Sequence, residues 1–205
     1  MTLPLLFALA ILIAAIVPGP DFAMVVRNTV LAGRSSGVWT AFGIGLGVCV
    51  WVVATSFGLA ALLAASATAF TAVKFAGAAY LVYLGVKSLR AAIKERREPA
   101  AIELARDMSA WAAFRSGLMC NMLNPKAAVL FTALMPQFID GGGPHGPLVL
   151  ELAAVGMSVC FLWYLLLANL IELMRSLLDR PRVRAWLSGV TGAVMVAFGL
   201  RVAAT

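Results

Sequence analysis

Long apolar runs separated by short polar stretches follow one another from end to end of the chain. Apolar residues make up 62% of its 205 residues and charged residues only 12%, whereas a soluble domain carries roughly a quarter charged residues. Such a chain has too little polar surface to coat a globule in water. This disfavours a water-soluble enzyme, a nucleic-acid binder and a disordered tail. We therefore expect its helices to lie in a lipid bilayer.

Six of the apolar runs are long enough to cross the bilayer, because a spanning helix needs about 20 apolar residues. They predict spans at residues 3–26, 38–65, 69–90, 112–138, 148–173 and 185–203. The expected fold is all-α and polytopic, with six transmembrane helices. Residues 1–93 and 111–205 are expected to form two three-helix units, joined by a charged cytoplasmic loop at 94–110.

The lysine and arginine residues predict which loops face the cytoplasm. Most of the 16 positive residues fall in or beside the first, third and fifth loops, and the first is expected to carry Arg27 and Arg34. Because positive residues are retained in cytoplasmic loops, these loops are expected inside and both termini outside. The net charge of +7 then reflects this bias and not nucleic-acid binding. Three tryptophans at predicted span starts, where indole rings meet the headgroups, favour the same placement: Trp39, Trp111 and Trp186.

Two interruptions fall at corresponding places in the two units. The first span is broken by Pro18-Gly19-Pro20 and its counterpart, the fourth, by Asn124-Pro125. Proline breaks a helix but is favoured at the first position of a new one, after an N-capping Asn or Gly. Since each unit has three spans, a repeat between them must be inverted in the membrane. The sequence therefore predicts a three-plus-three inverted repeat with two broken helices in the interior of the bundle.

Two ionisable residues, Asp21 and Lys126, directly follow the breaks. An unpaired charge at the centre of the membrane costs about 2.5 to 3.5 kcal/mol, so a functional site is the favoured interpretation. The structural alternative is a plain ion pair between the two, or an Asp21 shallow enough to reach the headgroups. Helix N-termini and an ammonium suit a carboxylate, while a carboxylate and freed carbonyls suit an amine. Together they predict a binding site for a small zwitterion.

Other polar and aromatic residues are candidates for the same cavity. Asn121 lies one turn before Asn124, although an interhelical hydrogen bond explains it at least as well. Trp51 and Trp163 occupy similar depths in the second and fifth spans, where walling the cavity and plain packing are equally favoured. The predicted substrate-binding residues are Asp21, Asn121, Asn124, Lys126, Trp51 and Trp163.

Metal, cofactor and catalytic chemistry have no support in the sequence. The three cysteines are dozens of residues apart in apolar runs, and His145 is alone in a glycine-rich loop, so neither a metal site nor a cofactor is expected. No serine, histidine and aspartate share a common depth, which argues against an enzyme. The glycines of Gly43-Ile-Gly-Leu-Gly47 predict close helix packing and not a phosphate loop.

The residues around the two breaks resemble those of the LysE/RhtB family of bacterial amino-acid exporters. The resemblance rests on Pro18-Gly19-Pro20-Asp21-Phe22 and on Asn124-Pro125-Lys126-Ala127, and it extends over essentially the whole chain. It implies export of an amino acid or a close analogue from the cytoplasm, across the inner membrane, coupled to the proton motive force. Asp21 is then the candidate for proton coupling, because its protonation would respond to burial, to Lys126 and to the substrate.

We therefore predict a secondary transporter that exports a small amino acid or derivative by alternating access. Its expected place is the bacterial inner membrane with both termini periplasmic, and its partners are the amino acid, protons and lipid, with a homo-oligomer compatible with the sequence. The alternative is an inorganic-ion exporter of the same architecture. A divalent cation would want several carboxylates or thiolates, whereas only Asp21 lies deep in the predicted bundle.

Overall fold

The computed structural model describes residues 3–56, 82–90, 108–139, 146–174 and 181–204, with a few further positions between 71 and 93. Within these residues all regular structure is helical, which confirms the predicted all-α class. The elements in chain order are α1 (Leu3–Ile16), α2 (Pro20–Ala32), α3 (Arg34–Ser56), α6 (Ala110–Met122), α7 (Pro125–Leu134), η2 (Met135–Gln137), α8 (Gly146–Leu173) and α10 (Pro181–Ala204). Residues 82–90 are also helical.

Two helices, α3 and α8, are long and apolar enough to cross a membrane. A third candidate is the pair α1 and α2, which meets the same criteria together and is bent by 61° at its break. The described residues therefore contain two or three candidate spans. Residues 57–65 of the predicted second span and nine of the 22 positions of the predicted third span lie outside them, as do almost all of the predicted loop at 94–110 and His145.

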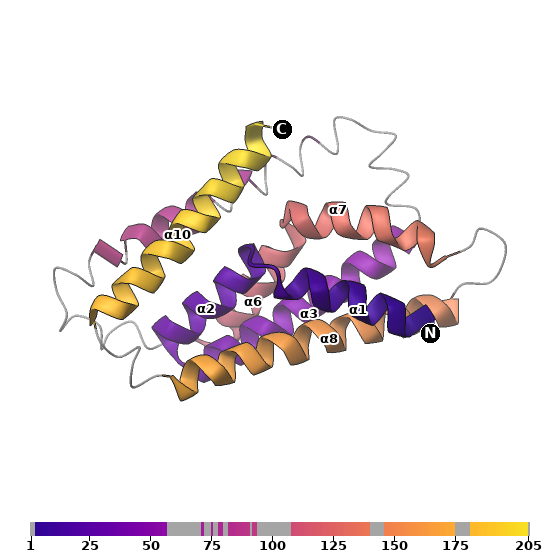
Figure 1. Cartoon of the computed structure of the whole chain (residues 1–205), viewed down its shortest axis with the longest axis horizontal. Coiled ribbons are helices and arrows are strands. Elements are labelled where there is room, and N and C mark those ends of the chain that lie inside the picture. The colour runs from indigo at the N-terminus through magenta and orange to yellow at the C-terminus, as the bar shows by residue number, and fades with distance from the viewer. Residues whose placement is uncertain are drawn as a thin grey trace.

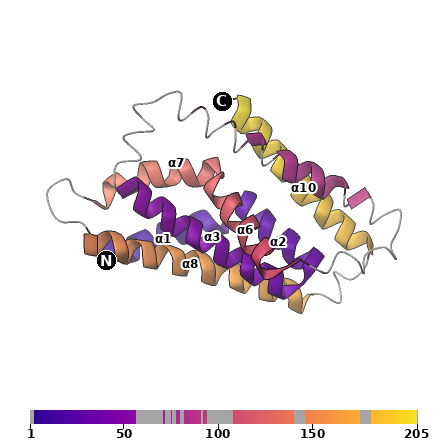
Figure 2. The same cartoon turned by 180° about the vertical axis from the view of Figure 1, so that it is seen from behind.

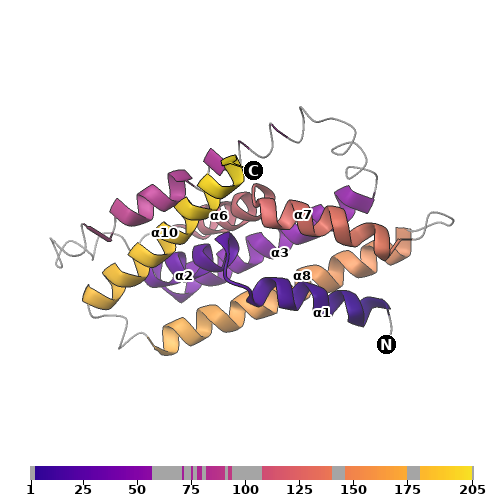
Figure 3. The same ribbon diagram turned by 45° about the horizontal axis from the view of Figure 1, so that its top comes forward.

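The helix α3 lies at the centre of the described structure. It packs against α6 on one side and α8 on the other, while α1 runs along α8 and α2 contacts α3, α6 and α8 (Figures 1 and 2). The helix α10 lies beside residues 82–90 and leans against α2, outside this central group (Figure 3). The core of the central group holds large side chains from α1, α3, α7 and α8.

Glycines bring α3 close to α6. A Cβ atom at Gly43 would collide with the backbone of Phe114, and one at Gly117 of α6 would collide with the carbonyl of Thr40. Small residues at such crossings allow two backbones to approach closely and gain dispersion contacts in a lipid environment. The predicted packing role of the glycines in this part of α3 is confirmed.

The prediction of a first cytoplasmic loop that carries Arg27 and Arg34 is wrong. The helix α2 continues to Ala32 and α3 begins at Arg34, so Gly33 alone connects them. Gly33 has φ of +85°, a backbone conformation that favours glycine, and its N–H donates to the carbonyl of Thr29 at 2.9 Å. Arg27, expected in that loop, is instead buried within α2.

Polar side chains made this segment look like a loop, but they satisfy one another inside the protein. The Arg27 guanidinium donates to Asn28 Oδ1 at 2.9 Å. The Asn28 amide then donates to Thr40 Oγ1 of α3 at 2.9 Å and to Ser116 Oγ of α6 at 2.8 Å. Because a buried polar group is tolerated when it is hydrogen-bonded, the segment can stay helical and joins three helices.

Three tryptophans stand near the beginnings of α3, α6 and α10, and these beginnings lie toward the same end of the molecule (Figures 1 and 3). Trp39, Trp111 and Trp186 are all exposed. An exposed indole ring fits the headgroup region of a bilayer, where its apolar body and its N–H can both be accommodated. Exposed tryptophans gathered toward one end of a helical bundle are typical of an aromatic belt.

Candidate functional site

The chain leaves the helical path after Ile16, and α2 begins at Pro20. Gly19 is the N-cap of α2 in an extended conformation (φ −166°, ψ −168°), and Pro20 stands at its first turn. Proline has no N–H to lose at this position, and its fixed φ suits a helix start. Asp21 therefore falls in the first turn of a helix that begins in the interior of the molecule.

A second interruption separates α6 from α7. The helix α6 ends at Met122, and α7 begins at Pro125 with Asn124 as its N-cap. The Asn124 side-chain oxygen accepts a hydrogen bond from the backbone N–H of Lys126 at 3.0 Å. This side chain supplies one of the partners that the first turn of a helix lacks, and it fixes the direction in which α7 leaves the break.

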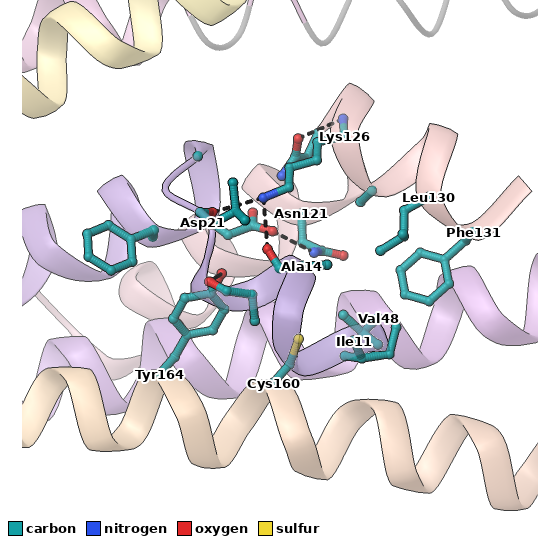
Figure 4. A pocket seen from close by; sticks show the side chains of 16 residues that line it. Ile11, Ala14, Asp21, Val48, Asn121, Lys126, Leu130, Phe131, Cys160 and Tyr164 are labelled. Carbon is teal, nitrogen blue, oxygen red and sulfur yellow. Dashed lines mark hydrogen bonds between the residues drawn. The ribbon is translucent and has the colours of Figure 1, made fainter. Parts of the chain in front are cut away.

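The two breaks border one pocket (Figure 4). Four of the predicted binding residues line it together: Asp21, Asn121, Asn124 and Lys126. They come from α2, from α6, from the second break and from α7. The breaks therefore gather one acidic, one basic and two amide side chains around a common space.

Asp21 is held in this pocket by Asn121. The Asn121 amide donates to Asp21 Oδ2 at 2.9 Å, and Asp21 is only 9% exposed. The other oxygen, Oδ1, has no hydrogen-bond partner within the described part of the chain. An orphaned carboxylate oxygen in a buried site is costly unless a donor reaches it, so Asp21 keeps the capacity to bind one more donor.

Lys126 does not form an ion pair with Asp21 in the described structure. Its ammonium donates to the carbonyls of Ala14 and Val17, at 2.8 and 2.9 Å. Ala14 lies in the last turn of α1 and Val17 directly follows the helix, where intrahelical donors run out and a cation is favourable. The ammonium therefore ties the end of α1 to the start of α7 while it borders the pocket.

Apart from Gly19, which was predicted as part of the first break, the rest of the lining comes from residues that were not predicted for the site. Ile11, Val48, Leu130 and Phe131 supply apolar surface from α1, α3 and α7. Cys160 and Tyr164 line the pocket from α8, and the Tyr164 hydroxyl donates to the carbonyl of Ala15 at 3.4 Å. A spacing of four places Cys160 and Tyr164 on one face of a helix, which was the available signal for that pair.

The two tryptophans predicted for the cavity do not line this pocket. Trp51 is buried and its indole N–H donates to the backbone carbonyl of Asn121 at 3.2 Å. It therefore supports the residue that holds Asp21. Trp163 is partly buried against the central core, and its indole nitrogen has no hydrogen-bond partner among the described residues.

Comparison with known proteins decides what kind of molecule carries this pocket. The LysE type translocator family model matches residues 12–205. The chain belongs to the LysE translocator family. This confirms the resemblance drawn from the two break motifs, and the chain is a membrane transporter and not an enzyme.

Relatives of this LysE-family translocator cover nearly its full length. An uncharacterised membrane protein of Pseudomonas aeruginosa is 32% identical over 96% of this chain and 93% of its own. The membrane protein YrhP of Bacillus subtilis is 31% identical over 91% of both chains. The threonine efflux protein of Escherichia coli is 27% identical over 94% of this chain and 93% of its own. No solved structure gives a significant match to this translocator.

Proposed function

We propose that this LysE-family translocator exports a small amino acid or a close derivative from the cytoplasm, across the bacterial inner membrane, driven by the proton motive force. The observation that carries the proposal is the pocket between the two broken helices, with Asp21 and Lys126 both in its lining. The threonine efflux proteins of Escherichia coli and Salmonella typhimurium, 27% and 29% identical to the chain, support an amino acid as the cargo.

The free hydrogen-bonding capacity of the pocket matches a zwitterion. An ammonium has three N–H donors, and Lys126 uses two of them on the carbonyls of Ala14 and Val17. One donor remains for the carboxylate of a substrate. Asp21 uses Oδ2 on Asn121 and keeps Oδ1 for a donor. The α-amino group of the substrate would bind there.

Proton coupling follows from competition for the Asp21 carboxylate. A charge deep in a bundle needs a partner, and within the described residues Asp21 has an amide but no cation bound to it. In our proposal the substrate ammonium neutralises the carboxylate on one side of the membrane and a proton replaces it on the other. Cargo and proton would then cross in opposite directions and never together.

The proposed architecture is a six-span, three-plus-three inverted repeat, with units at 1–93 and 111–205, the loop at 94–110 inside and both termini outside. One feature of the described helices supports it. In both units a break is followed by a helix that begins with proline, at Pro20 and at Pro125. In carriers built from inverted repeats, such discontinuous helices meet at a midplane site around which the two units rock.

Transport by purified protein in liposomes tests the function. Vesicles loaded with a panel of labelled amino acids should lose one or a few of them when a proton gradient is imposed, and an uncoupler should abolish the loss. Asp21→Asn should reduce gradient-driven efflux at least tenfold. Glu151→Gln, a similar change at an exposed position of α8, should leave it unchanged.

The two parts of the proposal fail separately. If no amino acid of the panel leaves the vesicles, the proposed cargo is wrong. Full gradient-driven efflux by Asp21→Asn, at normal protein levels, would remove Asp21 from the coupling step and leave the cargo untouched.

A further inference from the structure

The Lys126 side chain joins the two helix breaks that border the pocket. Lys126 lies in the first turn of α7, directly after the second break. Its ammonium donates to the carbonyl of Ala14 at 2.8 Å and to that of Val17, the first residue of the break between α1 and α2, at 2.9 Å (Figure 4). On the way it passes Gly19, where an added Cβ would lie 3.6 Å from both Cδ and Nζ of the lysine. One side chain therefore spans both interruptions.

The other contacts of α1 hold it mainly to α8. Among the described residues, its backbone runs close to α8 and hardly approaches α2 or α7. Near its start, the ring of Phe7 packs on Phe138 with the ring centroids 5.3 Å apart. Near its end, the Tyr164 hydroxyl of α8 donates to the carbonyl of Ala15 at 3.4 Å. Within this part of the chain, the two hydrogen bonds from Lys126 are those that tie the end of α1 to α7.

A ligand can reach this ammonium without displacing packed side chains. Lys126 is only partly buried, and Val17 beside it is 50% exposed. An ammonium has three N–H donors, and the two carbonyls take two of them. A carboxylate can therefore bind the third donor first. Because a charged acceptor binds an ammonium more strongly than a neutral carbonyl does, it then draws the ammonium away and releases Ala14 and Val17.

We infer that the carboxylate of the cargo triggers the movement of this carrier, by taking Lys126 from α1 and so freeing the first break to move against the second. The inference rests on the proposed function and deepens it, because it gives the carboxylate a task beyond affinity. It also sets the class of cargo. A compound with an amine and a free carboxylate is carried, whereas an amine of the same shape without the carboxylate binds and is not carried.

Amino-acid α-amides separate a trigger from plain affinity. Threonine, valine, leucine, lysine and glutamate are each compared with their α-amide, which keeps the side chain and the α-amine and lacks the α-carboxylate. With the vesicle lumen at about pH 6.5, the α-amines of acids and amides are both protonated. A contact that gives only affinity is replaced by a saturating concentration, whereas a lost trigger lowers the maximal rate.

The maximal rate of efflux is measured from liposomes that hold the wild-type protein. The membrane potential is clamped at zero, because the amides carry one more positive charge, and the leak from protein-free vesicles is subtracted. For each amino acid that is exported, the α-amide should have a maximal rate lower by about tenfold or more. Competition binding in lipid nanodiscs should show that the amide still occupies the site, with a lower affinity than the acid.

The inference and the proposed function fail separately in these measurements. An amide that reaches the maximal rate of its acid, or one that never competes with it, overturns the inference while amino-acid export stands. If none of the five amino acids binds and none leaves the vesicles, the proposed function itself is wrong.

Lys126→Met removes the ammonium and should free the first break without any cargo. Spin labels on Leu9→Cys of α1 and Val129→Cys of α7, both exposed and outside the pocket lining, report the distance between these helices in a background without the native cysteines. With Lys126 present, an exported amino acid should shift the distance distribution and its amide should not. Lys126→Met should show the shift without ligand. Lys87→Met, the same change at an exposed lysine, should not. An unshifted distribution in folded Lys126→Met protein would overturn the inference.

Discussion

Asn121 is positioned from two sides by residues of α3. Trp51 donates to its backbone carbonyl, and Gly47, one turn earlier, leaves the space that its side chain occupies. The amide of Asn121 in turn holds Asp21. The predicted binding role of Trp51 stays a prediction, but the structure gives this tryptophan a definite task in supporting the carboxylate.

Gly47→Ala should disturb the site without touching the substrate. A new Cβ would lie 2.5 Å from Asn121 Oδ1 and 2.9 Å from its Cβ, so Asn121 must shift away from Asp21. Hydrogen bonds to charged groups are worth about 1.5 to 3 kcal/mol, so substrate affinity should fall about tenfold or more. Competition binding measures this, and Gly189→Ala, whose Cβ would meet only Ala92 at 3.9 Å, is the matched control. Equal affinities for the two variants would contradict the assigned role of Gly47.

Gly33→Ala should destabilise the protein through the backbone alone. Nothing lies within 4 Å of a Cβ built at Gly33, but φ is +85°. With ψ at 175°, Gly33 lies in a region that residues with a side chain rarely adopt, at a cost of about 1 to 3 kcal/mol. The substitution should therefore lower the melting temperature by a few degrees in detergent. Gly146→Ala has the same open space and no positive φ, and should melt like the wild type. Equal melting temperatures for the two variants would show that the backbone at Gly33 does not require glycine.

At the scale of the elements, the Asn28 side chain joins α2, α3 and α6. Asn28→Ala should remove this connection and leave the buried Arg27 guanidinium without one of its acceptors. Breaking a buried hydrogen bond costs about 1 to 3 kcal/mol. The melting temperature should therefore fall clearly. Asn169→Ala removes an amide that is hydrogen-bonded to Arg34 near the surface, and it should lower the melting temperature less. The opposite order would show that the network contributes little.

The helix breaks were accessible from sequence because their chemistry is local. Proline after glycine or asparagine specifies a helix start at Pro20 and Pro125 whatever surrounds it. That the chain stays helical at Arg27 could not be predicted. Polarity alone does not distinguish a solvated turn from polar side chains that hydrogen-bond to one another between helices. The apolar lining of the pocket was equally hidden. In a chain that is 62% apolar, Val48 and Phe131 look like any other core residue.

At the scale of the whole molecule, the proposed inverted repeat predicts opposite sidedness for two loops. In a background without Cys49, Cys120 and Cys160, Arg96→Cys should react with an impermeant thiol reagent only from the cytoplasmic side. Gly142→Cys should react only from the outside. Intact cells and inverted membrane vesicles distinguish the two cases. Labelling of both positions from one face would refute the proposed topology.

The connection between α2 and α3 is a single residue. Because Gly33 alone links α2 to α3 and the Asn28 side chain bonds Thr40 across them, we expect these two helices to move together during any change of shape. Within the described residues, the longer non-helical stretches at 17–19 and 123–124 are then the expected hinges. We therefore expect the two breaks that border the pocket to be the places where its walls bend.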